Sequence, residues 1–305
     1  MNHTIIIAEI GECFNGEIQT AERLMTAAKE AGCDIVKFQT LDYENIADDD
    51  PEGDWFKKVA LDPEKIEYFI KYSKKLDIDI LFTPENIKTC KWLLDAGLKN
   101  VKIASSSMAD IELFQFIKDN FSKIYLSTGM ASLDEVVKAV SFFKNADELY
   151  IMHCISEYPC GPLLDKYGLR ALSNENVRLN MMKMLMYLFP NYKVGYSDHT
   201  DQILAPVAAV AAGAKIIEKH ITLDRKKPVD NFNNNKEYLG TDHVLSLEPD
   251  ELKEMVRQIR EVEKMFGDWQ WERTEGEKYM LHFLRGRFSG DWSMENYETL
   301  TKNEK

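Results

Sequence analysis

The chain has 305 residues, 45% of them apolar, which is enough for one large hydrophobic core. Its formal net charge of -13 argues against nucleic acid and anionic membrane surfaces as partners. The five cysteines follow no disulfide or zinc spacing, and no apolar run approaches the roughly 20 residues that cross a bilayer. The N-terminus also lacks the apolar segment of a secretion signal, so we expect a cytoplasmic protein.

Short apolar segments rich in β-branched residues recur eight times, and nearly every one ends in polar or ionisable residues. We predict strands over residues 4–10, 35–38, 79–82, 101–104, 124–126, 150–152, 194–196 and 215–217. Apolar positions at helical spacing predict helices over residues 21–31, 64–75, 87–96, 111–120, 132–143, 177–189, 203–212 and 252–266. This alternation indicates an α/β fold with a parallel sheet and outer helices. Eight such units close most economically into a (β/α)8 TIM barrel, although a doubly wound sheet has the same local pattern.

The barrel is predicted to span residues 1–267. Beyond it the helical periodicity fails, and residues 268–305 are predicted to form a short C-terminal extension that packs on the barrel or on a partner subunit. Three long segments, residues 41–62, 156–175 and 224–247, follow strands and should therefore rise on the catalytic face. They either cover a substrate or are tolerated surface insertions.

Ionisable side chains stand inside or directly after several predicted strands. In chain order these are Glu9, Lys37, Lys102, His199 and His220. Serine and threonine commonly end strands, but charged residues are costly in apolar segments unless they are paired or functional. In a TIM barrel the carboxyl ends of all strands meet at one mouth, which carries the active site. Two imidazoles from adjacent strands suit Mn²⁺, Co²⁺ or Zn²⁺ better than Ca²⁺, so His199 and His220 are predicted metal ligands.

Nine short motifs carry a resemblance to a known family. In chain order they are Glu9-Ile10-Gly11, Lys37-Phe38-Gln39-Thr40, Thr83-Pro84, Lys102-Ile103-Ala104-Ser105, Leu126-Ser127-Thr128-Gly129-Met130, His153-Cys154, Tyr196-Ser197-Asp198-His199-Thr200, Glu218-Lys219-His220 and Ser246-Leu247-Glu248-Pro249-Asp250-Glu251-Leu252. Over roughly residues 5–267 the chain thus resembles the sialic acid synthase family, which includes N-acetylneuraminate, legionaminate and pseudaminate synthases. The resemblance implies a TIM barrel that condenses phosphoenolpyruvate with an amino-sugar aldehyde, using a divalent metal. The product would be a nonulosonic acid, with release of phosphate.

The resemblance also implies roles for particular residues. His199 and His220 would hold the metal, Mn²⁺ first and Mg²⁺ or Co²⁺ as alternatives, and this metal would polarise the aldehyde oxygen. Phosphoenolpyruvate would be bound by Lys37, Thr83, Lys102, Ser105, Ser127 and Ser197, and the sugar by Gln39, Tyr158 and Asp242. Apart from the resemblance, the position of Glu9 inside an apolar strand predicts that it acts as the catalytic acid or base. The alternative for Glu9 is a buried ion pair with Lys37 or Lys102.

The chain departs from the family pattern mostly on the sugar side. Cys13 and Phe14 replace an Asn-His pair, and Ser107 stands where an acidic residue contacts the sugar. The loop after the eighth strand has an insertion between Pro228 and Leu239, and the tail is too short for the antifreeze-like lid domain that commonly ends family members. We therefore expect a homodimer in which residues 227–240 and 268–305 together replace that lid.

Two other functions remain open on the sequence. The first is a synthase of the octulosonate or heptulosonate type, which needs extra cations for a phosphorylated sugar, and Arg225-Lys226-Lys227 could supply them. The second is a barrel that keeps the anion site and binds a ligand without turnover. The sequence alone leaves the acceptor sugar, the metal and the oligomeric state undetermined.

Overall fold

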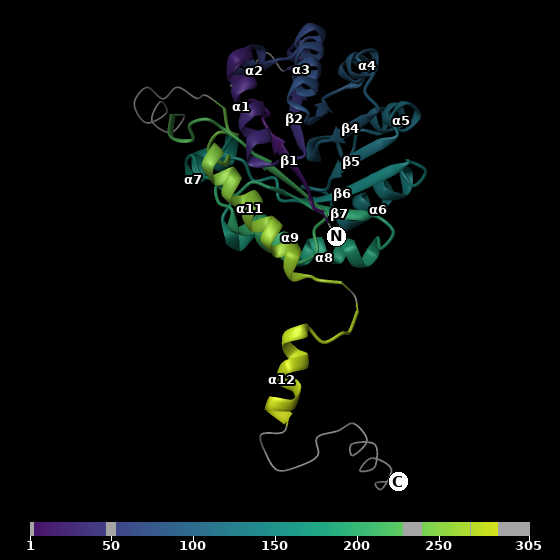
Figure 1. The fold of residues 1–305 in the computed structure, drawn as a ribbon. Helices are drawn as coiled ribbons and strands as arrows, with labels where there is room; N and C mark the ends of the chain where they lie inside the picture. Colours follow the sequence, from purple (N-terminus) through teal and green to yellow (C-terminus); the bar gives the residue numbers. More distant parts are fainter. Residues whose placement is uncertain (1–2, 47–52, 228–239, 269, 286–305) are drawn as a thin grey trace. The chain divides into compact units, whose positions relative to one another are not determined.

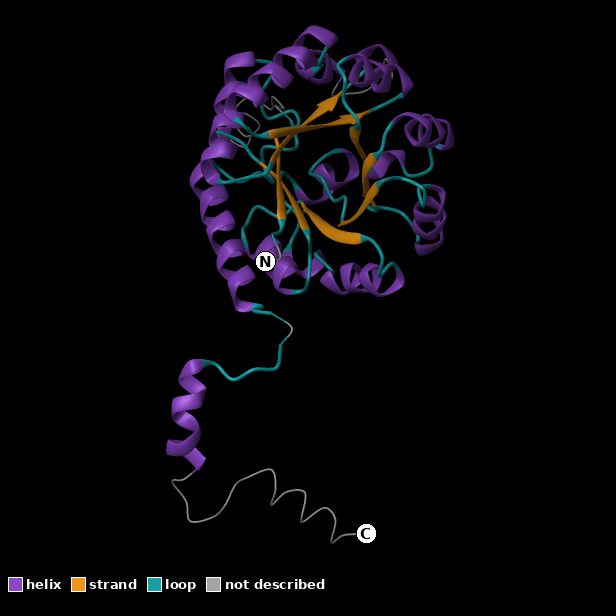
Figure 2. Cartoon of the chain, turned by 45° about the vertical axis from the view of Figure 1, so that its right-hand side comes forward, coloured by secondary structure: helices purple, strands orange, loops and turns teal. Residues whose placement is uncertain are grey.

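A computed structural model describes residues 3–46, 53–227, 240–268 and 270–285. The chain divides into two units, residues 1–266 and 267–305. The first unit is a ring of parallel strands surrounded by helices, as Figures 1 and 2 show. The predicted (β/α)8 TIM barrel is therefore confirmed. Among the helices of these described ranges, none has the length and apolar character that a bilayer crossing needs.

The strands are short and buried on both faces, as is usual for a parallel barrel. They are β1 (Ile5–Glu9), β2 (Ile35–Thr40), β3 (Asp79–Pro84), β4 (Asn100–Ile103), β5 (Lys123–Ser127), β6 (Glu148–Cys154), β7 (Lys193–Asp198) and β8 (Ile216–His220). Hydrogen-bonded pairs join them in the order β3-β2-β1-β8-β7-β6-β5-β4. The edges β3 and β4 lie side by side, and the Asn100 side-chain amide donates to the Ile80 carbonyl oxygen at 3.1 Å. This contact bridges the gap that remains in the ring.

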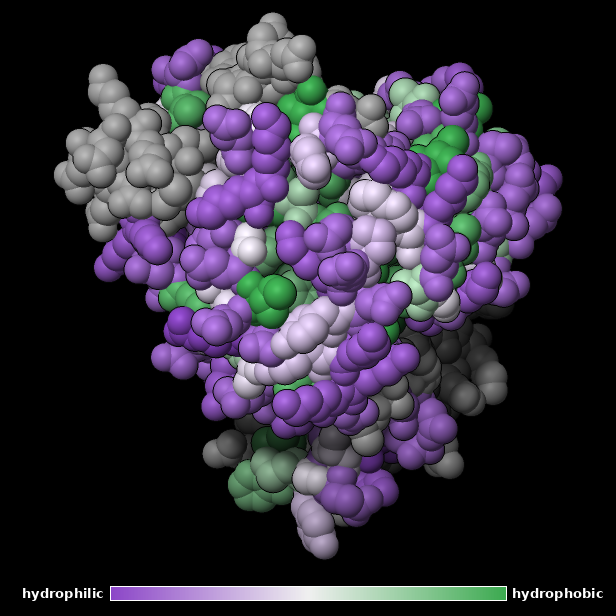
Figure 3. Space-filling model, turned by 90° about the horizontal axis from the view of Figure 1, so that it is seen from above, coloured by the Kyte–Doolittle hydropathy of each residue, from purple (hydrophilic) through white to green (hydrophobic). Residues whose placement is uncertain are grey.

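Helices follow the strands, and several of them begin at a residue whose side chain accepts from a backbone amide of the first turn. In the first unit they are α1 (Ile18–Ala31), α2 (Gly53–Val59), α3 (Pro63–Leu76), α4 (Ile87–Asp95), α5 (Ile111–Asn120), α6 (Leu133–Phe142), α7 (Gly161–Tyr167), α8 (Leu179–Leu188), α9 (Leu204–Ala211) and α11 (Pro249–Met265), with the 3-10 helices η1 (Tyr43–Asn45), η2 (Ser105–Ser107) and η3 (Asn174–Asn176). Asp62 and Asp110 cap α3 and α5 through their carboxylates. The outer surface seen in Figure 3 is mostly hydrophilic with small separate apolar spots, as expected for helices that turn their polar faces to water.

The segments predicted as long loops contain short helices. α2 lies in the segment after β2, and α7 lies in the segment after β6. The expectation that helical periodicity fails throughout the tail is wrong, because α12 (Glu275–Arg285) lies there. Tyr279, Met280 and Phe283 are exposed apolar residues at helical spacing in α12. How the tail packs stays a prediction.

Two apolar regions hold the barrel together. The larger lies between strands and helices, where outward-facing strand residues such as Ile6 and Val36 are fully buried. The smaller fills the barrel interior with Ile7, Ile35, Leu81, Tyr125, Tyr150, Met152 and Ile216. Because side chains alternate along a strand, the next inward-facing layer lies two residues further along each strand. In this layer the strand register brings Glu9, Lys37 and His220 together, next to the apolar residues that fill the barrel interior.

Candidate active site

Inward-facing residues at the carboxyl ends of the strands line one polar cavity of about 340 Å³. Eleven of the twelve predicted site residues line it, namely Lys37, Gln39, Thr83, Lys102, Ser105, Ser127, Tyr158, Ser197, His199, His220 and Asp242. The twelfth, Glu9, is fully buried and pairs with Lys37 in the cavity floor. The tertiary structure therefore brings the predicted residues together, while their individual roles stay predictions.

The three long segments all reach this cavity, as predicted. Leu41 and Phe56 come from the segment after β2, Tyr158 from the segment after β6, and Thr241 from the segment after β8. The insertion between residues 228 and 239 lies outside the described residues, and so does the tail beyond α12. The prediction that both replace a lid concerns those parts of the chain.

Glu218 contacts both lysines and a serine hydroxyl in the cavity floor. The sequence predicted no role for this residue. Its carboxylate accepts hydrogen bonds from the Lys102 ammonium at 2.8 and 2.9 Å and from the Ser197 hydroxyl at 2.9 Å. The Lys37 ammonium lies 3.3 Å from the same carboxylate. A signal for Glu218 exists in the sequence, because it stands two positions before His220 on one strand and therefore on the same inward face.

The charged groups of this floor shift each other's pKa values. Burial lowers the pKa of the Lys37 ammonium to about 7, and Lys102 acts in the same direction while Glu218 acts against it. Burial alone would raise the pKa of Glu218, but the Lys102 and Lys37 ammoniums outweigh burial and hold that pKa below its ordinary value. Two lysines are thus compensated by Glu218 and Glu9. An anion that enters the cavity must share these lysines with the protein's own carboxylates.

Glu9 forms the ion pair that was the alternative to a catalytic role, with Lys37 as its partner at 2.8 Å. Among the described residues, no hydrogen-bond donor of good geometry reaches either oxygen of Glu9. The position of Gly11 indicates where the carboxylate points. Gly11 has φ 50°, and a Cβ added there would lie 2.9 Å from Glu9 Oε1 and 2.6 Å from Asp242 Oδ2. Glu9 therefore lies between the lysine floor and Asp242, and its catalytic role stays a prediction.

His199 and His220 face each other, with ring centroids 5.5 Å apart. His199 Nδ1 lies 2.7 Å from the Ile155 carbonyl oxygen, which can only accept, so in the neutral ring this nitrogen carries the proton and Nε2 keeps the lone pair. That Nε2 lies 2.8 Å from the Tyr158 hydroxyl. His220 Nδ1 lies 3.3 Å from Asp242 Oδ2, and no hydrogen bond of good geometry reaches it within the described part of the chain.

These groups fit a divalent metal by their chemistry. Imidazole nitrogens with a neighbouring carboxylate suit first-row divalent ions, and burial lowers the pKa of His220, which favours the neutral form that binds a metal. Within residues 3–46, 53–227, 240–268 and 270–285, no three His, Cys, Asp or Glu side chains already converge on one ion position. His199 and His220 are the residues that would hold a metal, with the Asp242 carboxylate beside His220.

The departures at Cys13 and Phe14 fall outside the cavity lining. Phe14 packs edge-on against Phe38 and Phe69, with ring centroids 6.0 and 6.1 Å apart, in the core between strands and helices. Cys13 is buried, and its sulfur lies 3.5 Å from the Ser246 hydroxyl. Both residues therefore pack behind the site. Ser107, by contrast, lines the cavity itself.

Glu12 is a second lining residue without a predicted role. One of its carboxylate oxygens accepts a hydrogen bond from the Trp55 indole at 2.6 Å, and the other accepts from the Asp242 backbone amide at 3.1 Å. Glu12 thereby joins the segment after β1, helix α2 and the segment after β8 at one side of the mouth. A cavity-lining carboxylate that is nearly buried had no local signal in the sequence, because its partners are distant along the chain.

The cations proposed for a phosphorylated sugar lie elsewhere. Arg225 and Lys226 line a separate cavity of about 500 Å³ that contains none of the predicted site residues. Arg225 is already paired with Glu251 at 2.8 Å. In the active cavity the charged lining above the floor is acidic, with Glu12, Glu85 and Asp242, and no arginine is among its described lining residues.

Comparison with known proteins shows which family this chain resembles. The family model described as NeuB family matches residues 24–271 of this chain. The N,N'-diacetyllegionaminic acid synthase of Campylobacter jejuni is 34% identical over 304 residues, covering 93% of this chain and 84% of that protein. The N-acetylneuraminate-9-phosphate synthase of Mus musculus is 31% identical over 280 residues, covering 86% of this chain and 71% of that protein.

Solved structures agree with the sequence matches. An N-acetylneuraminic acid synthetase from Leptospira borgpetersenii superposes with a TM-score of 0.81 at 28% identity, covering 95% of this chain and 94% of that chain. A truncated 3-deoxy-D-arabino-heptulosonate 7-phosphate synthase from Thermotoga maritima, at a TM-score of 0.62 and 12% identity, shares the fold alone. The predicted resemblance is thus confirmed over most of the chain. The chain belongs to the NeuB family of phosphoenolpyruvate-dependent nonulosonate synthases, which are transferases.

Proposed function

We propose that this chain condenses phosphoenolpyruvate with an amino-sugar aldehyde that carries no phosphate, forming a nonulosonic acid and releasing phosphate. One observation carries the proposal: a single cavity combines a lysine and hydroxyl floor with two facing imidazoles and a carboxylate. Family members use divalent metals, and Mn²⁺ is proposed here, with Mg²⁺ or Co²⁺ as alternatives. A homodimer and a cytoplasmic location are further proposals that rest on the sequence.

The floor suits the two anionic groups of phosphoenolpyruvate. Lys37 and Lys102 supply positive charge, and four hydroxyl groups around them supply hydrogen bonds, those of Thr83, Ser105, Ser127 and Ser197. Lys37 Nζ already donates to the Thr83 hydroxyl at 3.2 Å, so the cation and the hydroxyl lie within reach of one ligand oxygen. Hydrogen bonds between a cation and a phosphate or carboxylate are roughly twice as strong as neutral ones.

The mouth suits a sugar aldehyde without a second phosphate. Gln39, Tyr158 and Asp242 are the proposed sugar contacts. A bound metal at His199 and His220 would polarise the aldehyde oxygen as a Lewis acid. Glu9 is the proposed acid or base, since its carboxylate points toward the same region. The acidic lining would repel a phosphorylated sugar, which disfavours the octulosonate or heptulosonate type of reaction.

Phosphate release tests the proposal directly. The protein is incubated with phosphoenolpyruvate, Mn²⁺ and a panel of hexosamine aldehydes, each offered free and phosphorylated. Release with free sugars supports the proposed acceptor class, and release with phosphorylated sugars alone contradicts it. Tight binding of phosphoenolpyruvate with no release across the panel would favour the ligand-binding barrel.

The variants Lys37→Met and Lys102→Met are expected to bind phosphoenolpyruvate more weakly. Each removes a cation that would hydrogen bond to the donor, and losing one such bond costs about 1.5–3 kcal/mol, or roughly 10- to 100-fold in Kd. Titration calorimetry measures this Kd. Lys88→Met is the matched control, because Lys88 pairs with Asp42 and Glu44 and does not line the cavity. Unchanged affinity in both cavity variants would show that these lysines serve another purpose.

Donor affinity is expected to fall as the pH rises above about 7. The pKa of Lys37 in the free cavity is about 7, so the ammonium that an anion needs is lost above this pH. Binding then requires uptake of a proton, which costs more at each higher pH. Calorimetric Kd values between about pH 6 and pH 9, in two buffers of different ionisation enthalpy, measure the slope and the proton uptake. In Lys37→Met the Kd for phosphoenolpyruvate should depend less on pH. If the pH dependence of Kd is the same as in the wild type, another group titrates.

A further inference from the structure

A fully buried ion pair lies behind the two proposed metal ligands. Asp198 immediately precedes His199, and Lys219 immediately precedes His220. Asp198 and Lys219 are direct register partners between β7 and β8. Because side chains alternate along a strand, the two histidines point into the cavity and the pair points outward. The carboxylate and the ammonium are 2.6 Å apart, and neither residue is exposed to solvent.

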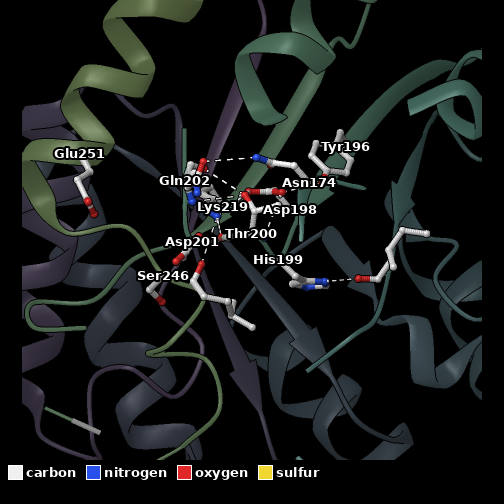
Figure 4. A network of polar contacts seen from close by, with 12 residues as sticks. Asn174, Tyr196, Asp198, His199, Thr200, Asp201, Gln202, Lys219, Ser246 and Glu251 are labelled. Carbon is white, nitrogen blue, oxygen red and sulfur yellow. Dashed lines mark hydrogen bonds and ion pairs between the residues drawn. The ribbon is translucent and has the colours of Figure 1, made fainter. Parts of the chain in front are cut away.

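The pair is fully hydrogen bonded. Asp198 accepts from the Tyr196 hydroxyl at 2.6 Å, from the Thr200 hydroxyl at 2.8 Å and from the Thr200 amide at 3.2 Å. Besides Asp198, Lys219 donates to the carbonyl oxygens of Thr200 and, at 3.2 Å, Leu245. All three ammonium protons therefore have acceptors. Figure 4 shows Asp198, Thr200 and Lys219 joined in one network, with the His199 ring turned away from it.

Lys219 ties together the chain segments that carry the proposed metal site. Through Thr200 it holds the backbone directly after His199. Through Leu245 it holds the segment that also carries Asp242.

The same segment is fastened at two further points. The Leu247 amide donates to the His220 carbonyl oxygen at 2.9 Å. The Ser246 hydroxyl donates to the Asp242 carbonyl oxygen at 2.5 Å. The placement of His199, His220 and Asp242 therefore depends on one network behind the cavity wall.

Stability does not explain a charge pair at this position. Replacing a buried ion pair by apolar residues of similar volume is often neutral or stabilising, because desolvation offsets most of the attraction between the charges. A pair that fixes backbone geometry from behind would instead act on the groups in front of it, as outer hydrogen bonds act on metal ligands in general. We propose that Asp198 and Lys219 are positioning residues that set the spacing of the metal site. This inference rests on the proposed metal-dependent function.

The test separates positioning from stability by removing both charges at once. The double variant Asp198→Leu/Lys219→Met is expected to lose less stability than Lys219→Met alone, because no buried charge is left unpaired and only the neutral hydrogen bonds of Tyr196, Thr200 and Leu245 are lost. Its Co²⁺ affinity should fall about 10- to 100-fold, the usual effect of losing outer partners of metal ligands, and its Co²⁺ absorption spectrum should change. The single variant Lys219→Met should lose stability, since it leaves Asp198 buried and unpaired.

Arg260→Met is the matched control at the opposite end of the barrel. Arg260 donates to the Thr4 carbonyl oxygen at 2.9 Å and pairs with Glu263 at 2.8 Å, next to the start of β1. This variant should lower the denaturation midpoint and leave Co²⁺ affinity unchanged.

Three outcomes would overturn the inference. Wild-type Co²⁺ affinity in the double variant would make the pair merely structural. If the double variant fails to fold, Lys219→Arg is measured instead, because arginine keeps the positive charge and changes the shape of the group. Unchanged Co²⁺ affinity in Lys219→Arg would also make the pair merely structural. A wild-type chain that takes up no Co²⁺ would contradict the proposed metal site itself, and this inference with it.

Discussion

Replacing His220 by alanine is expected to abolish turnover and metal retention while the barrel stays folded, and His199→Ala should do the same. The two imidazoles face each other across 5.5 Å and are the proposed ligands, so either change leaves one. Loss of the metal removes the charge that would stabilise the developing oxyanion. Electrostatic stabilisation of this kind is worth about 10²–10³-fold in rate or more. Phosphate release and the metal content of the purified protein measure the two effects.

His153→Ala is the matched control for these variants. His153 is also a buried histidine at the carboxyl end of a strand, but it contacts the Val177 carbonyl oxygen at 2.9 Å and does not line the cavity. The His153→Ala protein should be less stable than the wild type and should retain the metal. Full activity in a metal-free His220→Ala protein would refute the proposed site.

Glu218→Gln is expected to reduce the free energy of unfolding by about 3–5 kcal/mol, the usual result of removing one partner of a buried ion pair. The change leaves Lys37 and Lys102 with Glu9 as the remaining carboxylate of the floor. Phosphoenolpyruvate should then stabilise the variant more than it stabilises the wild type, because its anionic groups replace the missing carboxylate. Denaturant unfolding with and without phosphoenolpyruvate measures both effects.

The pH dependence of this destabilisation follows from the pKa of Glu218. That pKa lies below its ordinary value in the folded chain, so the ionised carboxylate stabilises the fold above the unfolded value of about 4.3. The stabilisation is lost as the pH falls toward the folded value, and the difference between wild type and variant should shrink in acid. Glu85→Gln is the control, since Glu85 lines the same cavity and accepts from the Asp42 amide. If both variants lose the same free energy of unfolding, Glu218 does not stabilise the fold more than another carboxylate of the cavity.

The sequence by itself determined the barrel and the kinds of groups at its mouth. Period-2 and helical spacing are local properties, and eight alternating units leave few ways to bury every apolar face. Residues that follow the strands are then expected to share one site, because parallel strands in a closed barrel present their carboxyl ends at one face. For this reason Lys37, Lys102, His199 and His220 could be assigned to one site before any distance was known.

The tertiary structure decided which of these groups meet. Lys102 and Glu218 are 116 positions apart, and only ring closure brings them within 2.8 Å. Glu9 pairs with Lys37 because β1 and β2 are register neighbours, whereas Lys102 lies on β4, across the ring. Phe14 faces the core because an aromatic cluster surrounds it. Such pairings depend on register, closure and burial, which no local pattern in the chain encodes.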